Sequence, residues 1–270
     1  MDFFDLSYLT AHRMNVENST LAHVRWAFAL IVFLMTACAS SPPVPDAQVI
    51  AASPWAVASA IGENPAPWTH REFPGKRASL YRSARMDGRD VMAVESHASA
   101  SMLRQTVHVE AAQINKLRFS WKVPELIAEA DLNLQEYADS PVRVVLAFEG
   151  DRSKFSAKNA MLSELAHVLT GEPMPYATLV YVWCNRDPVE RVVINPRTDR
   201  VREIVMESGP RNLHRWMDYE RDIRADFLKA FGEPPGALVA IGVMTDTDNT
   251  GSTARAWYGS VQHLLAATVP

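Results

Sequence analysis

The residues best placed for chemistry lie in one short loop, Thr245–Gly251, which runs Thr-Asp-Thr-Asp-Asn-Thr-Gly. Asp246, Asp248 and Asn249 offer two carboxylates and an amide oxygen. Ca²⁺ takes roughly six to eight oxygen ligands, and closely spaced Asp and Asn supply them. Three interpretations stay open: a polar turn in which Asp and Asn bond their own backbone, a structural calcium site, and a ligand-facing site. The Glu that completes an EF-hand loop is absent.

A second group of charged residues, Glu220, Arg221 and Asp222, lies where apolar spacing predicts a helix over Asn212–Phe231. Carboxylates four residues apart share one face of such a helix. Paired carboxylates do acid–base work when one of them is held protonated. Arginines interleave with these carboxylates, so a helix surface of ion pairs is the competing interpretation. The three residues are ligand-binding candidates.

Arg143 stands at the start of a strongly apolar segment. A guanidinium there either pairs with a carboxylate at the end of the sheet or faces a ligand, since its planar fork suits both. Glu149 and Asp151 follow the same apolar segment and are the expected partners.

Three aromatic residues, Trp183, Trp257 and Tyr258, are candidates for a sugar platform, because aromatic faces stack on the C–H surfaces of sugars. Trp183 is in phase with apolar neighbours on its strand, so it faces either the core or a ligand. Trp257 and Tyr258 are adjacent, and adjacent strand residues point to opposite faces. At least one of the two is therefore expected outside the core.

The elements that must position these side chains are mostly short strands. Val142–Phe148, Ala177–Cys184 and Ala237–Met244 are apolar runs of strand length, while Lys116–Val123 alternates as a half-buried strand does. Asp87-Gly88 predicts a hairpin turn.

Helical spacing appears over Lys158–Leu169, in addition to 212–231. The pattern predicts a mainly β fold, an antiparallel β-sandwich of the jelly-roll type with one or two short helices.

The N-terminus has the pattern of an export signal. Trp26–Ala37 is apolar, and its 12 residues are too few to span a bilayer, which needs about 20. Leu34–Cys38 resembles the box at which lipoprotein signals are cleaved. We therefore expect a signal peptide over 1–37, with Met14 as an alternative start, and a lipid on Cys38.

Residues 38–66 are rich in Ala, Ser and Pro and are expected to form a flexible tether from the lipid to one domain over 67–270. Ala39 follows the cysteine where Asp would retain a lipoprotein at the inner membrane. Under the sorting rule for enterobacterial lipoproteins, this favours the outer membrane, with the domain facing the periplasm.

Composition narrows the function further. The 270 residues carry a net charge of −4, which argues against a nucleic-acid partner. The sequence has two cysteines, so a lipid on Cys38 leaves Cys184 without a disulfide partner. Zinc-binding, phosphate-binding and serine-nucleophile motifs are absent from the sequence, and no catalytic residue is assigned.

Several segments resemble the bacterial domain-of-unknown-function family 3047, in its lipoprotein form. They are FSWKV (119–123), RVVLAF (143–148), YVW (181–183), ERDIRADFLKAFG (220–232) and VMTDTDNTG (243–251). The resemblance extends over about 68–262. It implies a β-sandwich similar to carbohydrate-binding modules, and it implies no mechanism.

Three hypotheses about function follow. The first is a non-catalytic binding module for a glycan or another envelope component. The second is a structural or assembly lipoprotein that binds an envelope protein, which predicts an exposed apolar patch. The third is a glycan-active lyase or hydrolase, which requires two carboxylates in one cleft.

Overall fold

The structure is a computed structural model in which residues 47–62 and 64–264 are described. These residues belong to one unit, Pro45–Pro270. The predicted signal peptide (1–37), the alternative start Met14 and the predicted lipidation site Cys38 lie outside the described residues. Within the described ranges, no helix has the length and apolar character needed to cross a bilayer.

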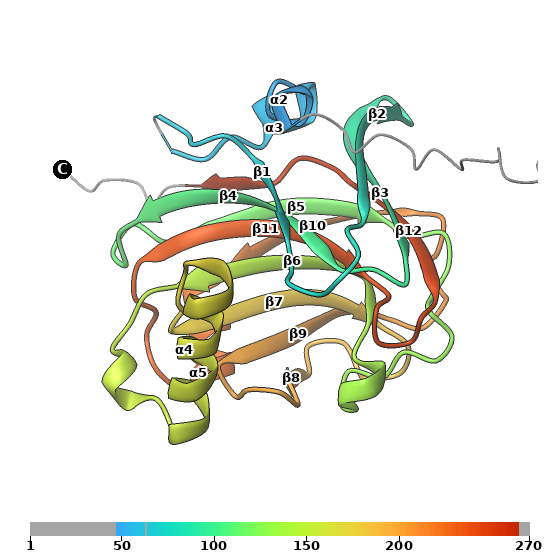
Figure 1. Ribbon diagram of the computed structural model, residues 1–270. Helices are drawn as coiled ribbons and strands as arrows, with labels where there is room; N and C mark the ends of the chain where they lie inside the picture. The colour runs from blue at the N-terminus through green and yellow to red at the C-terminus, as the bar shows by residue number, and fades with distance from the viewer. Residues whose placement is uncertain (1–46, 63, 265–270) are drawn as a thin grey trace, which may run out of the picture. The chain divides into compact units, whose positions relative to one another are not determined.

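Two sheets form the domain (Figure 1). Sheet A contains, in spatial order, β1 (Thr69–Glu72), β4 (Ser101–Val109), β11 (Leu238–Asp246), β6 (Ser140–Phe148), β7 (Ala177–Cys184), β9 (Val201–Ser208) and β8 (Val192–Ile194). Sheet B contains β10 (Trp216–Asp222), β5 (Lys116–Lys122), β12 (Thr253–Tyr258), β3 (Arg89–His97) and β2 (Leu80–Met86), with β13 (Gln262–Leu264) paired to β5. The predicted mainly β sandwich is confirmed. The strands of each sheet pair antiparallel, apart from the parallel pair β7 and β9.

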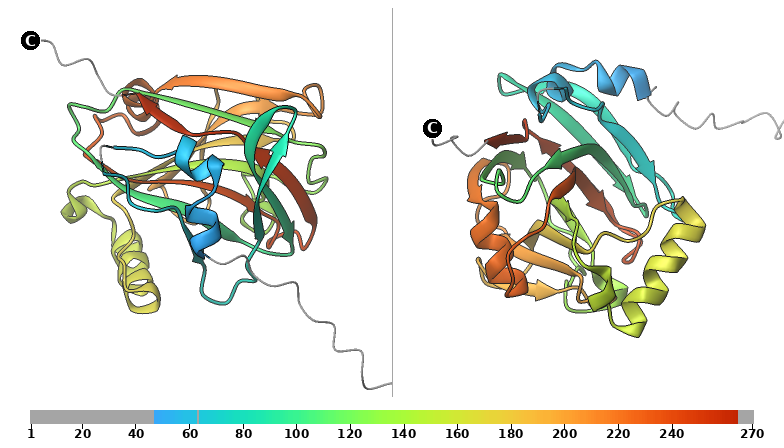
Figure 2. Two further views of the ribbon diagram at one scale, coloured as in Figure 1. Left: turned by 90° about the horizontal axis from the view of Figure 1, so that it is seen from above. Right: turned by 90° about the vertical axis from the view of Figure 1, so that its left-hand side faces the viewer.

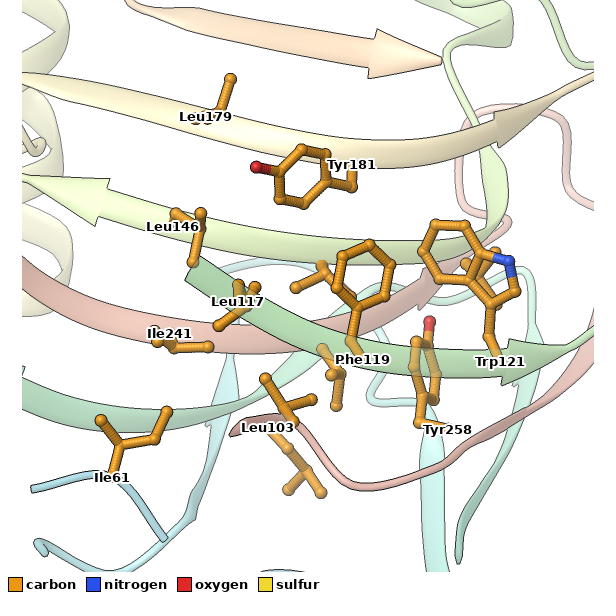
Figure 3. Packing of buried hydrophobic residues seen from close by; sticks show 14 of the residues in the cluster. Ile61, Leu103, Leu117, Phe119, Trp121, Leu146, Leu179, Tyr181, Ile241 and Tyr258 are labelled. Carbon is orange, nitrogen blue, oxygen red and sulfur yellow. The ribbon is translucent and has the colours of Figure 1, made fainter. Parts of the chain in front are cut away.

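The core lies between the two sheets and follows from alternation along the strands. On β6, Val144 and Leu146 are fully buried among inward-facing residues, whereas Arg143 and Val145 face the outer side. On β5, the predicted inward set includes Phe119 and Trp121, and both are buried (Figure 3). Phe119 stacks on Tyr181 of β7 with ring centroids 5.2 Å apart. Aromatic contacts of this kind hold the sheets together.

Two of the helices fall where a helix was expected. Helix α4 (Ala157–Thr170) coincides with the predicted helix over 158–169. Ser156 caps its N-terminus by accepting a hydrogen bond from the Asn159 amide, and Gly171 ends it in a left-handed conformation. Helix α5 (Ile223–Phe231) likewise ends at a left-handed Gly232. Two short 3₁₀ helices, η1 (Gln135–Tyr137) and η2 (Arg152–Lys154), flank β6.

The helix predicted over 212–231 is half wrong. Trp216–Asp222 forms strand β10, paired along its length with β5, and the helix begins only at Ile223. Asp222 accepts a hydrogen bond from the Ala225 amide and is the N-cap. The ladder to β5 therefore overrides the helical spacing, and the cap fixes the boundary between strand and helix.

The stretch expected as a tether contains two short helices, α2 (Ala47–Ala51) and α3 (Pro54–Ala58). Trp55 of α3 is completely buried, and its Nε1 donates to the Gly259 carbonyl at 2.9 Å. It packs against Trp68 with ring centroids 4.8 Å apart. The folded domain therefore begins before residue 67.

The two outer faces of the sandwich differ in what surrounds them. In Figure 2, α4 lies beside the sheets and well apart from α2 and α3, which contact β1, β2 and β3. Loops also border the outer face of sheet A: the β1–β2 loop, the β8–β9 loop and the β11–β12 loop all contribute residues to a cavity there. The outer face of sheet A is thus the natural place for a cleft.

Candidate functional site

A long cleft runs over the outer face of sheet A. It consists of two adjoining cavities of about 340 and 900 Å³. They share the lining residues Phe73, Pro74, Lys76, Met102, Val145, Thr178 and Val201. We call the whole the outer cleft, with a polar end at the smaller cavity and a wide end at the larger one.

The floor of the outer cleft is largely apolar. It is formed by outward-facing residues of β4, β11, β6, β7 and β9, such as Met102 and Val145. Gly242 on β11 permits this arrangement, because a Cβ there would lie 2.4 Å from the Met102 sulfur. These strands are apolar on both faces because one face packs into the core and the other forms the floor of the outer cleft.

Arg143 lies at the floor of the polar end and is 6% exposed. Its Nε donates to Asp246 Oδ1 at 2.9 Å, and its Nη1 donates to Glu203 Oε1 at 3.0 Å. Its Nη2 donates to the Ala138 carbonyl at 2.8 Å. The expected partners Glu149 and Asp151 are therefore wrong, and the guanidinium instead joins β6 to carboxylates on β11 and β9.

Negative charge exceeds positive charge in the buried part of this cluster. Asp139, Glu203 and Asp246 are each at most 5% exposed, and Arg143 is their buried counterion. Burial raises the pKa of Asp246 to about 6; the neighbouring guanidinium opposes that shift, and Asp139 and Glu203 reinforce it. The polar end therefore holds a carboxyl whose pKa burial raises well above its ordinary value.

Glu203 was missed by the sequence analysis. Its Oε1 accepts from Arg143 and from Asn195 Nδ2 at 3.2 Å. Its Oε2 is buried and has no hydrogen-bond partner among the described residues. The only sequence signal was a carboxylate inside the apolar segment Val201–Met206, with nothing to indicate which face it took.

Asp139 holds the loop in which the calcium motif lies. Its Oδ1 accepts from Asn249 Nδ2 at 2.7 Å, and its Oδ2 accepts from the Thr250 amide at 2.8 Å and the Thr250 hydroxyl at 2.7 Å. The loop is thus held from outside, by a residue of the segment before β6. In the polar-turn interpretation, Asp and Asn bond their own backbone; here the main acceptor is Asp139.

The other two residues of the motif face the cleft. Asp248 is ion-paired with Lys76 of the β1–β2 loop, and Asn249 Oδ1 accepts from Arg197 of the β8–β9 loop at 2.6 Å. Both residues line the polar end together with Asp246. The structure therefore brings four of the candidates, Arg143 among them, to one place.

A calcium site at this place stays a prediction. Oxygens of Asp139, Asp246 and Asp248 lie within 4.8 Å of one another, so the donor atoms are close enough for a cation. Each of the three carboxylates already has an amide, guanidinium or ammonium donor in this structure. Arg143 and Lys76 thus supply positive charge where a metal ion would otherwise do so.

The wide end carries a second set of charged groups that the sequence analysis missed. Glu172, just after α4, accepts from Arg104 of β4 at 2.7 and 3.0 Å and is also ion-paired with Arg71 of β1. The two arginines hold the pKa of Glu172 below its usual value, with the Arg104 hydrogen bond as the largest cause. Arg104 Nε is buried and has no hydrogen-bond partner among the described residues.

The charged candidates of β10 and α5 lie outside the outer cleft. Glu220 is ion-paired with Lys116 and Arg118 on sheet B. Arg221 bridges Asp226 and Glu190, with donor–acceptor distances of 2.6 to 3.1 Å. Asp222 is the cap of α5. The expected ion pairs are present, but Glu220 and Arg221 form them on strand β10 and not on a helix surface.

The aromatic candidates separate into core and surface. Trp183 and Tyr258 are completely buried (Tyr258 is labelled in Figure 3), so neither is accessible to a ligand. Trp183 Nε1 donates to the Gly209 carbonyl at 3.1 Å. Trp257 is partly exposed on the outer face of sheet B. The expectation that Trp257 and Tyr258 take opposite faces is met, and only Trp257 remains available.

The fold and its cleft define a β-sandwich protein with a ligand-sized cleft on one outer face. The family model described as "Protein of unknown function (DUF3047)" matches residues 66–262. The chain therefore belongs to this family.

A search of curated proteins found no match. Among solved structures, the chain is similar to the "Xyloglucanase domain of NopAA, a type three effector from Sinorhizobium fredii in complex with cellobiose". The TM-score is 0.34 at 9% identity, over 74% of this chain and 99% of that chain. A likeness of this size indicates neither a shared ligand nor a shared reaction.

Proposed function

We propose that the protein binds a glycan of the cell envelope in the outer cleft. The observation that carries this proposal is the placement of unpartnered polar atoms. Of four buried side-chain atoms without a hydrogen-bond partner in the described residues, two belong to residues that line the outer cleft: Glu203 Oε2 and Arg104 Nε. One is an acceptor and the other a donor. A sugar hydroxyl both donates and accepts, so a chain of sugars satisfies both atoms.

The rest of the outer cleft fits the same ligand class. Its floor is apolar, and its rim carries charged groups that ion pairs already hold in place. A sugar ring presents C–H faces to such a floor and hydroxyls to such a rim. Groups fixed before binding lose little freedom when a ligand arrives. The two adjoining cavities, of about 340 and 900 Å³, favour several linked sugar units over a single one.

Catalysis receives less support from the geometry. The hydrolase or lyase hypothesis needs two carboxylates that face one substrate. Glu220 and Glu149 do not line the outer cleft. Glu203, Asp246 and Asp248 do line it, but each is engaged in an ion pair. Binding without catalysis therefore remains the function we propose.

The binding test is isothermal calorimetry of the full chain with oligosaccharides cut from envelope polysaccharides. Val145 lies on the floor where the two cavities adjoin, so Val145→Phe is expected to fill the outer cleft and weaken binding at least tenfold. Val189→Phe is the matched control, since Val189 is 51% exposed and does not line the cleft. Equal affinity of wild type and Val145→Phe contradicts the proposal.

The anchoring proposal is separate from the ligand. We propose that Cys38 carries a lipid that holds the domain at the periplasmic side of the outer membrane, because Leu34–Cys38 resembles a lipoprotein cleavage box. Radiolabelled palmitate is expected to label the wild type and to leave Cys38→Ser unlabelled and either soluble or uncleaved. Membrane association of wild type without palmitate label contradicts anchoring.

One observation favours the second hypothesis, a protein partner in the envelope. Helix α4 exposes Met161, Leu165, Val168 and Leu169, between 51% and 78%, while Asn159 and Ser163 form its buried side. The spacing i, i+4, i+7 and i+8 places the four on one face. A photocrosslinker at Val168 is expected to give one discrete adduct in cells, and none at the exposed His167, which lies on another side of the helix. Equal, diffuse labelling at both positions contradicts a partner on α4.

A further inference from the structure

Two tryptophans flank a lysine on the outer face of sheet B. In the strand register, Lys122 of β5 lies opposite Trp216 of β10 on one side and opposite Trp257 of β12 on the other. Residues directly opposite each other on neighbouring strands point to the same face of a sheet. We call these three residues the tryptophan row.

The row faces outward because its neighbours along each strand face inward. Trp121 and Tyr258, adjacent to Lys122 and Trp257, are completely buried. Trp216 and Trp257 are partly exposed. Trp55, Trp68, Trp121 and Trp183 are each at most 2% exposed. Among the described residues, the two tryptophans of the row are therefore the ones that solvent reaches.

Hydrogen bonds fix Trp216 and Lys122 in place. Asp87, at the β2–β3 hairpin turn, accepts from Trp216 Nε1 at 3.0 Å and from Lys122 Nζ at 2.8 Å. These two donors, Lys122 first, hold the pKa of Asp87 below its usual value. Arg89 lies over the Trp216 ring, 4.8 Å from its centroid, and pairs with Asp218. The ring of Trp216 is thus held by Asp87 and Arg89 and stays partly exposed.

We propose that the tryptophan row is a second glycan-binding surface, separate from the outer cleft, that takes an extended polysaccharide lying across the strands of sheet B. Two strand spacings put the tryptophans about 9.5 Å apart, close to the length of two pyranose units in an extended chain. Each ring stacks on the C–H face of every second sugar. Arg89 and Asp218, which also line a cavity of about 380 Å³, offer hydrogen bonds to sugar hydroxyls.

The two surfaces bind independently because they lie on the outer faces of different sheets. This inference shares the ligand class of the proposed function and none of its residues. Measurements on sheet B alone therefore test this inference. Trp257, a candidate from the sequence, joins Trp216 and Lys122, which the sequence analysis did not assign to a site.

The test uses acrylamide quenching of tryptophan fluorescence, since the accessible tryptophans of the described domain are those of the row. The full chain carries Trp26→Phe, because Trp26 lies outside the described residues. Hydroxyethyl cellulose and a soluble mixed-linkage β-glucan are the probes. We expect at least one probe to reduce quenching at least twofold. Protection is expected to persist in Val145→Phe, where the outer cleft is filled.

Variants locate the binding surface. By gel retardation with the same probes, Trp257→Ala and Trp216→Ala are each expected to weaken binding about tenfold, and Trp257→Tyr, which keeps an aromatic face, less than threefold. Tyr137→Ala is the matched control, because Tyr137 is an exposed aromatic residue (42%) away from the row.

Two results overturn the inference: unchanged retardation of both alanine variants, or no protection from quenching by either probe. Neither result depends on the outer cleft, which the loss of calorimetric binding in Val145→Phe tests separately.

Discussion

The outer faces of the two sheets carry different kinds of candidate binding residues. Sheet A buries a cluster of charges at the end of a cleft, with Arg143 between Glu203 and Asp246. Sheet B leaves an open face on which Trp216 and Trp257 stand beside charged side chains. On sheet A, residues that would bind a ligand also hold the strands together. On sheet B, they add little to the fold. Substitutions should therefore affect stability on one face and binding alone on the other.

The largest expected effect is at Arg143. Arg143→Met leaves two buried carboxylates without their counterion, which is expected to lower the free energy of unfolding by about 3 to 5 kcal/mol. Urea unfolding at pH 7 measures it. Arg118→Met is the control on sheet B, because Arg118 is exposed and its ion pair with Glu220 lies in solvent. An equal loss of stability in both variants contradicts the contrast between the faces.

The next effect concerns the loop that completes the polar end. Asp139→Ala removes the acceptor of the Thr250 amide and hydroxyl and of Asn249. We expect a loss of about 2 kcal/mol, since hydrogen bonds to a buried charge are stronger than neutral ones. Hydrogen exchange is expected to accelerate at the Thr250 amide. Unchanged exchange there shows that Asp139 does not hold the loop.

A smaller effect is expected from pH. The pKa of Asp246 is raised to about 6 in the folded protein by burial. The native state therefore binds more protons than the unfolded state between about pH 4 and 6, so this group contributes less stability as pH rises through that range. The stability of wild type relative to Asp246→Asn is expected to fall by about 1 kcal/mol from pH 5 to 7. A difference that does not vary with pH contradicts this assignment.

The smallest change in stability is expected on sheet B. Trp257 is partly exposed, so Trp257→Ala is expected to cost less than about 1 kcal/mol in urea unfolding, although it weakens glycan retention. Trp183→Ala is the matched comparison, because the same ring is completely buried there, and a loss of about 3 to 5 kcal/mol is expected. Similar losses of unfolding free energy in Trp257→Ala and Trp183→Ala contradict the distinction between an exposed binding tryptophan and a buried core tryptophan.

Much of the fold follows from the sequence because its strands carry strong local patterns. The apolar runs of β6, β7 and β11 and the alternation of β5 match the strands observed. The segment 216–222 misled the prediction, because its aromatic residues also fit a helical spacing. Pairing with β5 decided between the two, and that contact joins residues about a hundred positions apart.

The site was only partly predictable for a related reason. The residue types at 143 and in the 246–249 loop indicated a polar binding site, and Arg143 and residues of this loop do line the outer cleft. The partners Glu149 and Asp151 were wrong because residues six or more positions along a strand lie about 20 Å away. The observed partners lie on other strands, and spacing along the sequence does not indicate which strands become neighbours in the sheet. Trp55 is a further example: the Ala- and Pro-rich sequence around it predicts a flexible tether, and nothing local indicates that its ring is buried.

The most direct test of glycan binding in the outer cleft is hydrogen exchange with the tryptophan row removed. In a Trp216→Ala/Trp257→Ala variant, a glycan that binds by calorimetry is expected to protect amides of residues 70–76 and 172–178, which border the outer cleft. Amides of 216–222 are expected to exchange as they do without ligand. Protection absent from 70–76 and 172–178, with binding still measurable, would place the ligand elsewhere and contradict the account.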